Sequence, residues 1–204
     1  GASIQLQMHR PAPAVFVFRT ERAGRLSTLV AHHVLQGRVV FPAAGYLEVA
    51  RAIGQQITEV DHHHRSICNV VFSKPLLVEA PDMQLECRSD SADFEVLKYS
   101  EDSRTVHCSG ALQSLVGRGG SMLVDFDLCA EVIREGSCAM HTPTLYAIFY
   151  DMHLEYGPDF RTIAECWNGE GGVGHLQRRR QRQGVHIHPG DLDGALQLFE
   201  VISS

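Results

Sequence analysis

A helical segment followed by four extended segments limits the folds open to this chain. From Ala43 or Ala44 to about Gln56 the apolar residues recur at helical spacing, and Pro42 stands just ahead, where a proline favours the start of a helix. Four extended runs follow at 67–78, 83–88, 94–99 and 104–115, divided by Pro81 and by polar turns. We therefore expect an α+β unit in which an antiparallel meander curls about one helix.

The residues before this unit are predicted to be irregular or extended. Residues 1–13 are expected to form an irregular arm. Val15, Val17 and the run 26–34 are expected to be strand-rich, because they are β-branched and lie on either side of a polar turn at 21–24.

A second region with helical and turn patterns occupies the last third of the chain. A short helix is expected at 145–152, with Thr142 as its N-cap and Pro143 at its first position. The chain then turns at 157–158 and forms a glycine-rich hairpin or loop at 167–174.

The helical pattern after Pro189 resembles the one after Pro42, 147 residues earlier, and two related units would explain this weak repeat. Its apolar positions are Leu192, Ala195, Leu196, Phe199 and Ile202. We expect a first unit at 1–118, a linker at 119–142 and a second unit at 143–204. No extended segments follow the second helix, so we expect this unit to be incomplete and residues 1–204 alone not to form a stable, active monomer.

Composition and charge exclude several classes of protein. The chain has 24 acidic and 18 basic residues and a formal net charge of −6, which argues against a nucleic-acid partner and suits small acyl substrates better. No stretch approaches the roughly 18 apolar residues of a membrane span, and the N-terminus has no signal-peptide pattern, so we expect a cytoplasmic protein. The six cysteines include no CxxC pair, which predicts free thiols in a reducing compartment.

Three motifs in a fixed order carry the strongest signal. The first is H-x-x-x-G-x-x-x-x-P, formed by His33, Gly37 and Pro42. The second is YGPDFR at 156–161, and the third is HPGDLDGALQ at 188–197. Together they resemble the motifs of dehydratase domains from modular polyketide synthases and animal-type fatty acid synthases.

The resemblance covers roughly residues 27–202, with weaker matches at 72–76 and 167–169. It implies a double hotdog fold, in which a curved antiparallel sheet wraps around a central helix twice. The second hotdog is expected to be truncated in this chain.

The resemblance also implies two catalytic roles. His33 matches the base that removes a proton from the carbon α to a thioester, and Asp193 matches the acid that protonates the departing β-hydroxyl. An imidazole is largely neutral near pH 7 and can accept a proton. An aspartate has an ordinary pKa of about 3.9, so the acid must be desolvated in an apolar pocket to keep its proton.

Other residues are expected to support this pair. Gln197 lies four residues after Asp193, on the same helix face, and its amide could orient the carboxyl group. Tyr156 could offer its hydroxyl to the substrate or to the acid. The free backbone N–H groups at the helix start, near Ala43 and Ala44, are suitable donors to a developing enolate.

The sequence departs from the family pattern at three positions. His32 precedes the base where family members often carry Asp, and Ala43 stands where Gly is common. Asp191 adds a carboxylate two residues before the proposed acid, and we expect it to face outward. Gly37 and Pro42 are expected to shape the backbone around the base.

Two charged clusters have alternative explanations. The histidines at 62–64, beside Asp61, lie in a polar connection and are more typical of a solvated loop than of a metal site. The basic cluster at 178–182 is explained either as an exposed loop or as a docking site for an acidic carrier protein.

The function implied is dehydration of a β-hydroxyacyl thioester to the α,β-unsaturated thioester. The substrate would be carried on the phosphopantetheine arm of an acyl carrier protein, with no metal and no other cofactor. Neighbouring polyketide synthase domains would be the other partners, and a homodimer stays open. The alternatives are a hotdog thioesterase and a catalytically silent, dehydratase-like scaffold domain.

Overall fold

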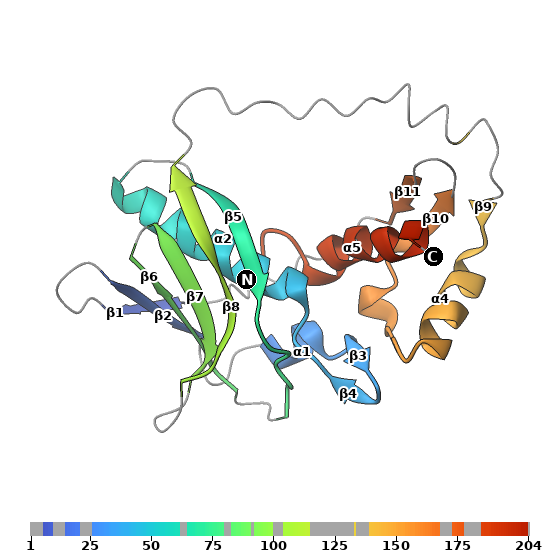
Figure 1. The fold of residues 1–204 in the computed structure, drawn as a ribbon, viewed down its shortest axis with the longest axis horizontal. Coiled ribbons are helices and arrows are strands. Elements are labelled where there is room, and N and C mark those ends of the chain that lie inside the picture. The colour runs from blue at the N-terminus through green and yellow to red at the C-terminus, as the bar shows by residue number, and fades with distance from the viewer. Residues whose placement is uncertain are drawn as a thin grey trace.

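A computed structural model describes residues 6–9, 15–20, 26–61, 65–79, 83–90, 92–99, 104–114, 133, 139–167, 173–177 and 185–203. Two curled regions, each with one long helix, meet near the middle of the molecule (Figure 1). No helix in these residues is long and apolar enough to cross a membrane.

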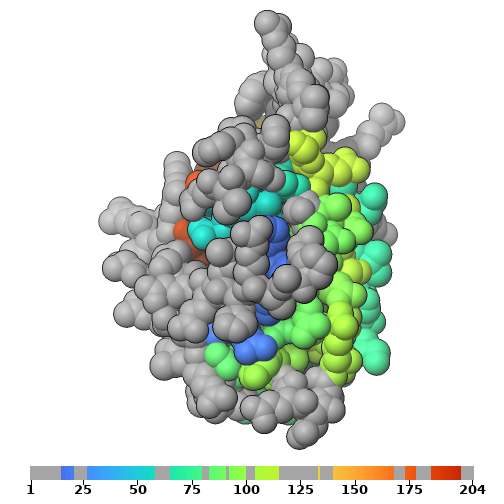
Figure 2. Space-filling model, turned by 90° about the vertical axis from the view of Figure 1, so that its left-hand side faces the viewer, coloured from blue at the N-terminus to red at the C-terminus, as the bar shows by residue number. Residues whose placement is uncertain are grey.

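The first region is a six-stranded antiparallel sheet that wraps around helix α2 (Ala43–Asp61). In spatial order its strands are β1 (Leu6–His9), β2 (Phe16–Thr20), β6 (Leu85–Ser89), β7 (Asp93–Lys98), β8 (Val106–Ser114) and β5 (Arg65–Phe72). In the side view of Figure 2 the green and yellow-green atoms of the central strands lie next to the cyan atoms of α2.

The core of this region lies between α2 and the inner face of the sheet. Residues at helical spacing on α2 are fully buried: Tyr46, Val49, Ala50, Ile53 and Ile57. They pack with strand residues that include Phe18, Leu85, Phe94, Val96 and Leu112. Burial of each large apolar side chain contributes roughly 1.5 to 3 kcal/mol, so this face of α2 holds the helix inside the sheet.

The second region contains the helices α4 (Thr142–Asp151) and α5 (Pro189–Ser203), the short 3-10 helix η1 (Pro158–Phe160) and a small sheet. That sheet has the order β11 (Val173–Leu176), β10 (Ile163–Trp167), β9 (Ala139–Met140), so β9 lies inside the segment predicted as the linker 119–142. Its core consists of Leu145, Tyr146, Phe149, Tyr156, Phe160, Ile163 and Cys166.

A short hairpin joins the two regions. It consists of β3 (Val34–Leu35) and β4 (Arg38–Val39), and Gly37 in its turn has a φ of +72°, a conformation that favours glycine. Leu35 bridges to Leu154 in the second region, while Val40, just after β4, bridges to Leu77 in the first. Helices α2 and α5 are also in contact.

Most predicted elements are confirmed, including α2, the strands after it, the turn at Pro158 and the helix at Pro189. The predicted hairpin or loop at 167–174 joins two paired strands, β10 and β11. The predicted four-strand meander is wrong in one respect. Strands β6, β7 and β8 form a meander, but β5 pairs with β8 and not with β6. Strand β5 therefore takes an edge of the sheet, beside the last strand of the meander.

Three local predictions are also wrong. The predicted irregular arm contains strand β1, which pairs with β2, and the predicted strand at 26–34 begins as helix α1 (Leu26–Val30). Leu29 and Val30 are buried in the core from a single helical turn, and this packing outweighs the strand preference of β-branched residues. Thr142 is not the N-cap of α4: His141 is, and the Thr142 hydroxyl donates to the Ala164 carbonyl on β10.

Several predictions lie outside the described residues. They are the turn at 21–24, most of the linker at 119–142, the histidines at 62–64, the basic cluster at 178–182, the cysteines Cys129 and Cys138, and the side chains of Phe199 and Ile202. The four described cysteines are Cys68, Cys87, Cys108 and Cys166, and all four are free thiols.

Candidate active site

His33 lies between α1 and β3, and both its backbone N–H and its backbone carbonyl are hydrogen-bonded. Its N–H donates to the Val30 carbonyl, and its carbonyl accepts from the Val40 N–H. The ring atom Nδ1 lies 2.7 Å from the Val40 carbonyl oxygen. Because a carbonyl only accepts, the proton of a neutral His33 is on Nδ1, and Nε2 carries the free lone pair.

Asp193 lies in the first turns of α5 and points at that lone pair. Its Oδ1 is 3.8 Å from His33 Nε2, and the two residues are only 5% and 7% exposed. This separation is too long for a direct hydrogen bond between the two side chains. Each of them is therefore available to contact a different atom of the same substrate. The structure therefore brings together the predicted base and acid across 160 residues of sequence.

Burial sets the protonation of the pair. Desolvation lowers the pKa of His33 below its ordinary value, an effect that the nearby Asp193 carboxylate partly opposes. Desolvation raises the pKa of Asp193, against the opposing effects of His33 and the Gln197 amide. Both shifts favour the neutral forms, an unprotonated imidazole and a protonated carboxyl, which are the forms that a general base and a general acid need.

Gln197 holds the Asp193 carboxyl group, which it reaches from the next turn of the same helix. Its Nε2 donates to Asp193 Oδ2 at 2.8 Å and to the Phe160 carbonyl at 3.0 Å, while its Oε1 accepts from the Tyr146 hydroxyl at 3.3 Å. Since Oδ2 accepts this hydrogen bond, the proton of a neutral Asp193 belongs on Oδ1, which faces His33.

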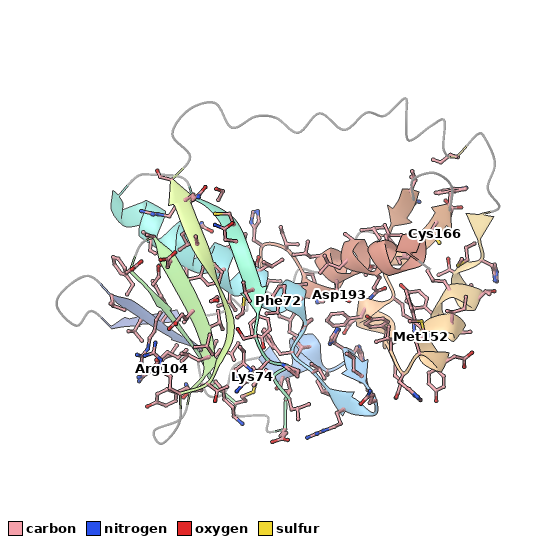
Figure 3. All side chains as sticks on the ribbon, in the orientation of Figure 1. Phe72, Lys74, Arg104, Met152, Cys166 and Asp193 are labelled. Atoms are coloured by element: carbon pink, nitrogen blue, oxygen red, sulfur yellow. The ribbon has the colours of Figure 1, made fainter. Side chains whose placement is uncertain are left out.

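The pair opens into a cavity of about 440 Å³. Its walls are largely apolar and are supplied by both regions: Leu35, Val40, Phe41, Tyr46, Phe72, Leu154, Tyr156 and Leu196. Ser73, Lys74 and Pro75 are exposed and also border it. Figure 3 shows Asp193 at the end of α5 that is directed toward Phe72 of β5.

The other predicted supporting residues are in place around this cavity. Tyr156 and Ala43 line it, and the Tyr156 ring lies 5.6 Å from the His33 ring. Pro42 is buried directly ahead of α2, whose first N–H groups have no partner within the helix. Gly37 lies in the turn between β3 and β4, and Val40 directly follows β4.

Three contributors were not predicted from the sequence. Val40 fixes the tautomer of the base, the Phe160 ring lies 5.1 Å from the His33 ring, and Tyr146 holds the Gln197 amide. Val40 and Phe160 lie inside the recognised motifs, whereas Tyr146 is part of an ordinary apolar helix and has no local signal.

Asp191 is only partly exposed, and one of its carboxylate oxygens is buried, so the expectation that it faces outward is only partly met. It is not among the described residues that line the cavity. Within the described part of the chain no three His, Cys, Asp or Glu side chains are grouped as metal ligands.

Comparisons with known proteins give a consistent result. Residues 4–105 match the family model "Polyketide synthase dehydratase domain", and residues 131–203 match the model "Polyketide synthase dehydratase N-terminal domain". The dehydratase domain from the CurF module of curacin polyketide synthase has a TM-score of 0.83 at 21% identity, covering 97% of this chain and 75% of that one. A trans-AT dehydratase domain from Brevibacillus brevis has a TM-score of 0.80 at 22% identity, covering 97% and 74%. These similarities confirm the double hotdog fold.

Curated relatives are far longer than this chain. Polyketide synthase ThaG of Burkholderia thailandensis is 31% identical over 88% of this chain, which corresponds to 3% of ThaG. Highly reducing polyketide synthase NEC1 of Pyricularia oryzae is 26% identical over 82% of this chain and 7% of its own length. On the family match, the fold and the shared motifs, the chain belongs to the dehydratase domain family of polyketide synthases.

Proposed function

We propose that this chain eliminates water from a β-hydroxyacyl thioester, with His33 as the base and Asp193 as the acid. The observation that carries the proposal is the placement of His33 Nε2 opposite Asp193 Oδ1 in one largely apolar cavity. Burial favours the unprotonated base and the protonated acid, so the resting pair is ready for the first step.

The elimination balances with protons alone. His33 Nε2 takes the proton from the carbon α to the thioester, and that electron pair forms the α,β double bond. The bond from the β-carbon to oxygen breaks, and the Asp193 Oδ1 proton converts the leaving hydroxyl to water. Transfer of the proton from His33 back to Asp193 restores the neutral pair, and no redox or nucleotide cofactor is needed.

Negative charge develops on the thioester oxygen as the α-proton leaves. The free N–H groups at the start of α2, next to Ala43 in the cavity wall, are the donors proposed for that oxygen. The positive end of the helix dipole favours the same charge.

The relatives support the choice of residue types and of context. Two solved structures of CurK dehydratase are described as inactive mutants, one with Asp replaced by Asn and one with His replaced by Phe. The curated relatives are polyketide synthases of which this chain matches 3 to 8%. We therefore propose an acyl carrier protein as the substrate carrier and other synthase domains as neighbours.

The test is turnover of a β-hydroxyacyl thioester by the complete protein and by three variants of it. His33→Ala and Asp193→Asn should each lower the rate by at least about 10² to 10⁴, because each removes one proton-transfer group. Asp191→Asn is the matched control and should keep the activity. Equal losses from the two aspartate variants would show that the acid is misassigned.

Product analysis separates the alternatives. The α,β-unsaturated thioester supports elimination, whereas the free β-hydroxy acid would indicate a thioesterase. No conversion of any β-hydroxyacyl thioester by the complete, folded protein would favour the silent scaffold.

A further inference from the structure

His33 and Asp193 belong to different regions of the molecule, and their separation depends on whatever connects those regions. The base lies between α1 and β3, in a segment with no regular secondary structure, and the acid lies on α5. The segment 153–160 lies between them and contacts both. The link runs through His32, the immediate neighbour of the base.

The first half of the link joins this segment to the chain around the base. His32 Nδ1 lies 2.9 Å from Asp159 Oδ2 and 3.4 Å from the Asp159 backbone nitrogen. The shorter contact places the proton on Nδ1, because a carboxylate only accepts. The Gly157 N–H donates to the His32 carbonyl, and the Glu155 N–H donates to the Val34 carbonyl, each at 2.8 Å. A Cβ at Gly157 would lie 2.8 Å from the His32 ring, so the glycine allows this close approach.

The second half of the link joins Asp159 to the helix of the acid. Asp159 belongs to η1, which packs against α5. A side chain at Gly190 would meet the Asp159 carbonyl, so the backbone of Asp159 rests directly on the first turn of α5, three residues before Asp193. Asp159 therefore contacts the neighbour of the base through its side chain and the start of the acid's helix through its backbone.

The same segment also supplies the aromatic wall behind the base. Tyr156 and Phe160 flank the residues of the link, and their rings lie 5.6 and 5.1 Å from the His33 ring. A shift of this segment would therefore move both the aromatic rings that contact the His33 imidazole and the start of α5.

We propose that His32 and Asp159 are positioning residues that set the distance and orientation of His33 relative to Asp193. The proposal rests on the proposed function for its catalytic consequence. The His32 and Asp159 side chains are 44% and 30% exposed, and a polar side-chain contact this exposed contributes little to stability. Its loss should therefore affect geometry more than folding.

The test is a double-mutant cycle with His32→Ala, Asp159→Ala and the double variant. Each single variant should lower kcat about tenfold with KM changed less than about twofold, because misplacement of catalytic groups costs rate more than binding. The double variant should lose no more than either single one, since both remove the same interaction. His32→Asn should recover activity to within about threefold, because its Nδ2–H can take the place of the histidine Nδ1–H.

Glu79→Ala is the matched control, because Glu79 forms an exposed ion pair with Arg38, at 2.8 Å, away from this link. It should leave kcat unchanged. Thermal unfolding of every variant establishes that the chain is folded. Losses that add in the double variant, a loss confined to KM, or unchanged kcat in the single variants would each overturn the proposal.

A measurement that does not depend on turnover separates this inference from the proposed function. An NMR titration of the His33 Cε1–H reports the pKa of the base directly. Loosening the link admits water to a ring whose pKa is lowered by desolvation, so His32→Ala and Asp159→Ala should raise that pKa. An unchanged titration would overturn the inference. The expected titration in a chain that dehydrates no substrate would instead overturn the proposed function alone.

Discussion

Replacing Gln197 with methionine would remove the polar group that orients the acid while keeping the length of the side chain. The substitution breaks three hydrogen bonds, to Asp193 Oδ2, to the Phe160 carbonyl and from the Tyr146 hydroxyl. Tyr146 keeps one partner, because its oxygen also accepts from the Ile163 N–H. The loss of stability therefore comes mainly from Asp193 Oδ2 and the Phe160 carbonyl, the two acceptors that lose their donor.

The size of the effect follows from burial. Gln197 is 2% exposed, and a buried acceptor that loses its donor costs about 1 to 3 kcal/mol, partly relieved by relaxation. We expect a loss of about 2 to 4 kcal/mol in the free energy of unfolding, which for a chain of this length lowers the melting temperature by about 4 to 16 °C. The freed carboxyl group should also lower kcat by about 10- to 100-fold, with little change in KM.

The pH profile gives the sharpest readout. The proposed elimination needs a protonated Asp193, so activity should fall as the pH rises through the pKa of that group. The Gln197 donor stabilises the carboxylate and lowers this pKa, so its removal raises the pKa and moves the alkaline limb to higher pH.

The assay is the pH dependence of kcat for both proteins, together with thermal unfolding. Gln55→Met is the control, because Gln55 is exposed on α2 and only accepts from Arg51. Its effect on stability should stay within about 0.5 kcal/mol. A Gln197→Met protein that is less stable but keeps kcat and the alkaline limb would refute an orienting role, as would a limb that moves to lower pH.

Three further predictions concern buried groups. Tyr46→Phe should stabilise the chain by about 1 kcal/mol in thermal unfolding, because the Tyr46 hydroxyl is buried without a hydrogen-bond partner among the described residues; a destabilised variant would show that this hydroxyl has a partner. Gly190→Ala should destabilise the chain by about 1 to 3 kcal/mol, since the new Cβ meets the rigid backbone carbonyl of Asp159, and an unchanged melting temperature would contradict that close approach. Because the pKa of His33 is lowered, the unfolded chain takes up a proton on this residue as the pH falls below about 6.5, while the folded chain does not. The free energy of unfolding should therefore decrease from that pH down to the folded-state pKa. The His33→Gln variant should lack this part of the pH dependence of unfolding.

Local patterns were enough to predict the main helices and the residues that meet in the candidate site. Helix α2 begins directly after a proline and helix α5 begins at one, and both show apolar residues at helical spacing. These two signals depend only on residues close together in the sequence. The recognised motifs indicated His33 and Asp193. The position of Gln197 on the same helix face as Asp193 followed from helix geometry alone, since residues four apart are neighbours.

Tertiary structure decided what depends on partners distant in the sequence. Helix α1 forms where strand propensity predicts otherwise, because Leu29 and Val30 are buried in the core. Strand β5 pairs with β8, from which β6 and β7 separate it in the sequence. The hydrogen bond from Tyr146 to Gln197 and the contact of His32 with Asp159 join residues 51 and 127 positions apart. The direction of each pKa shift in the catalytic pair depends on desolvation, which exists only once both regions close around the site.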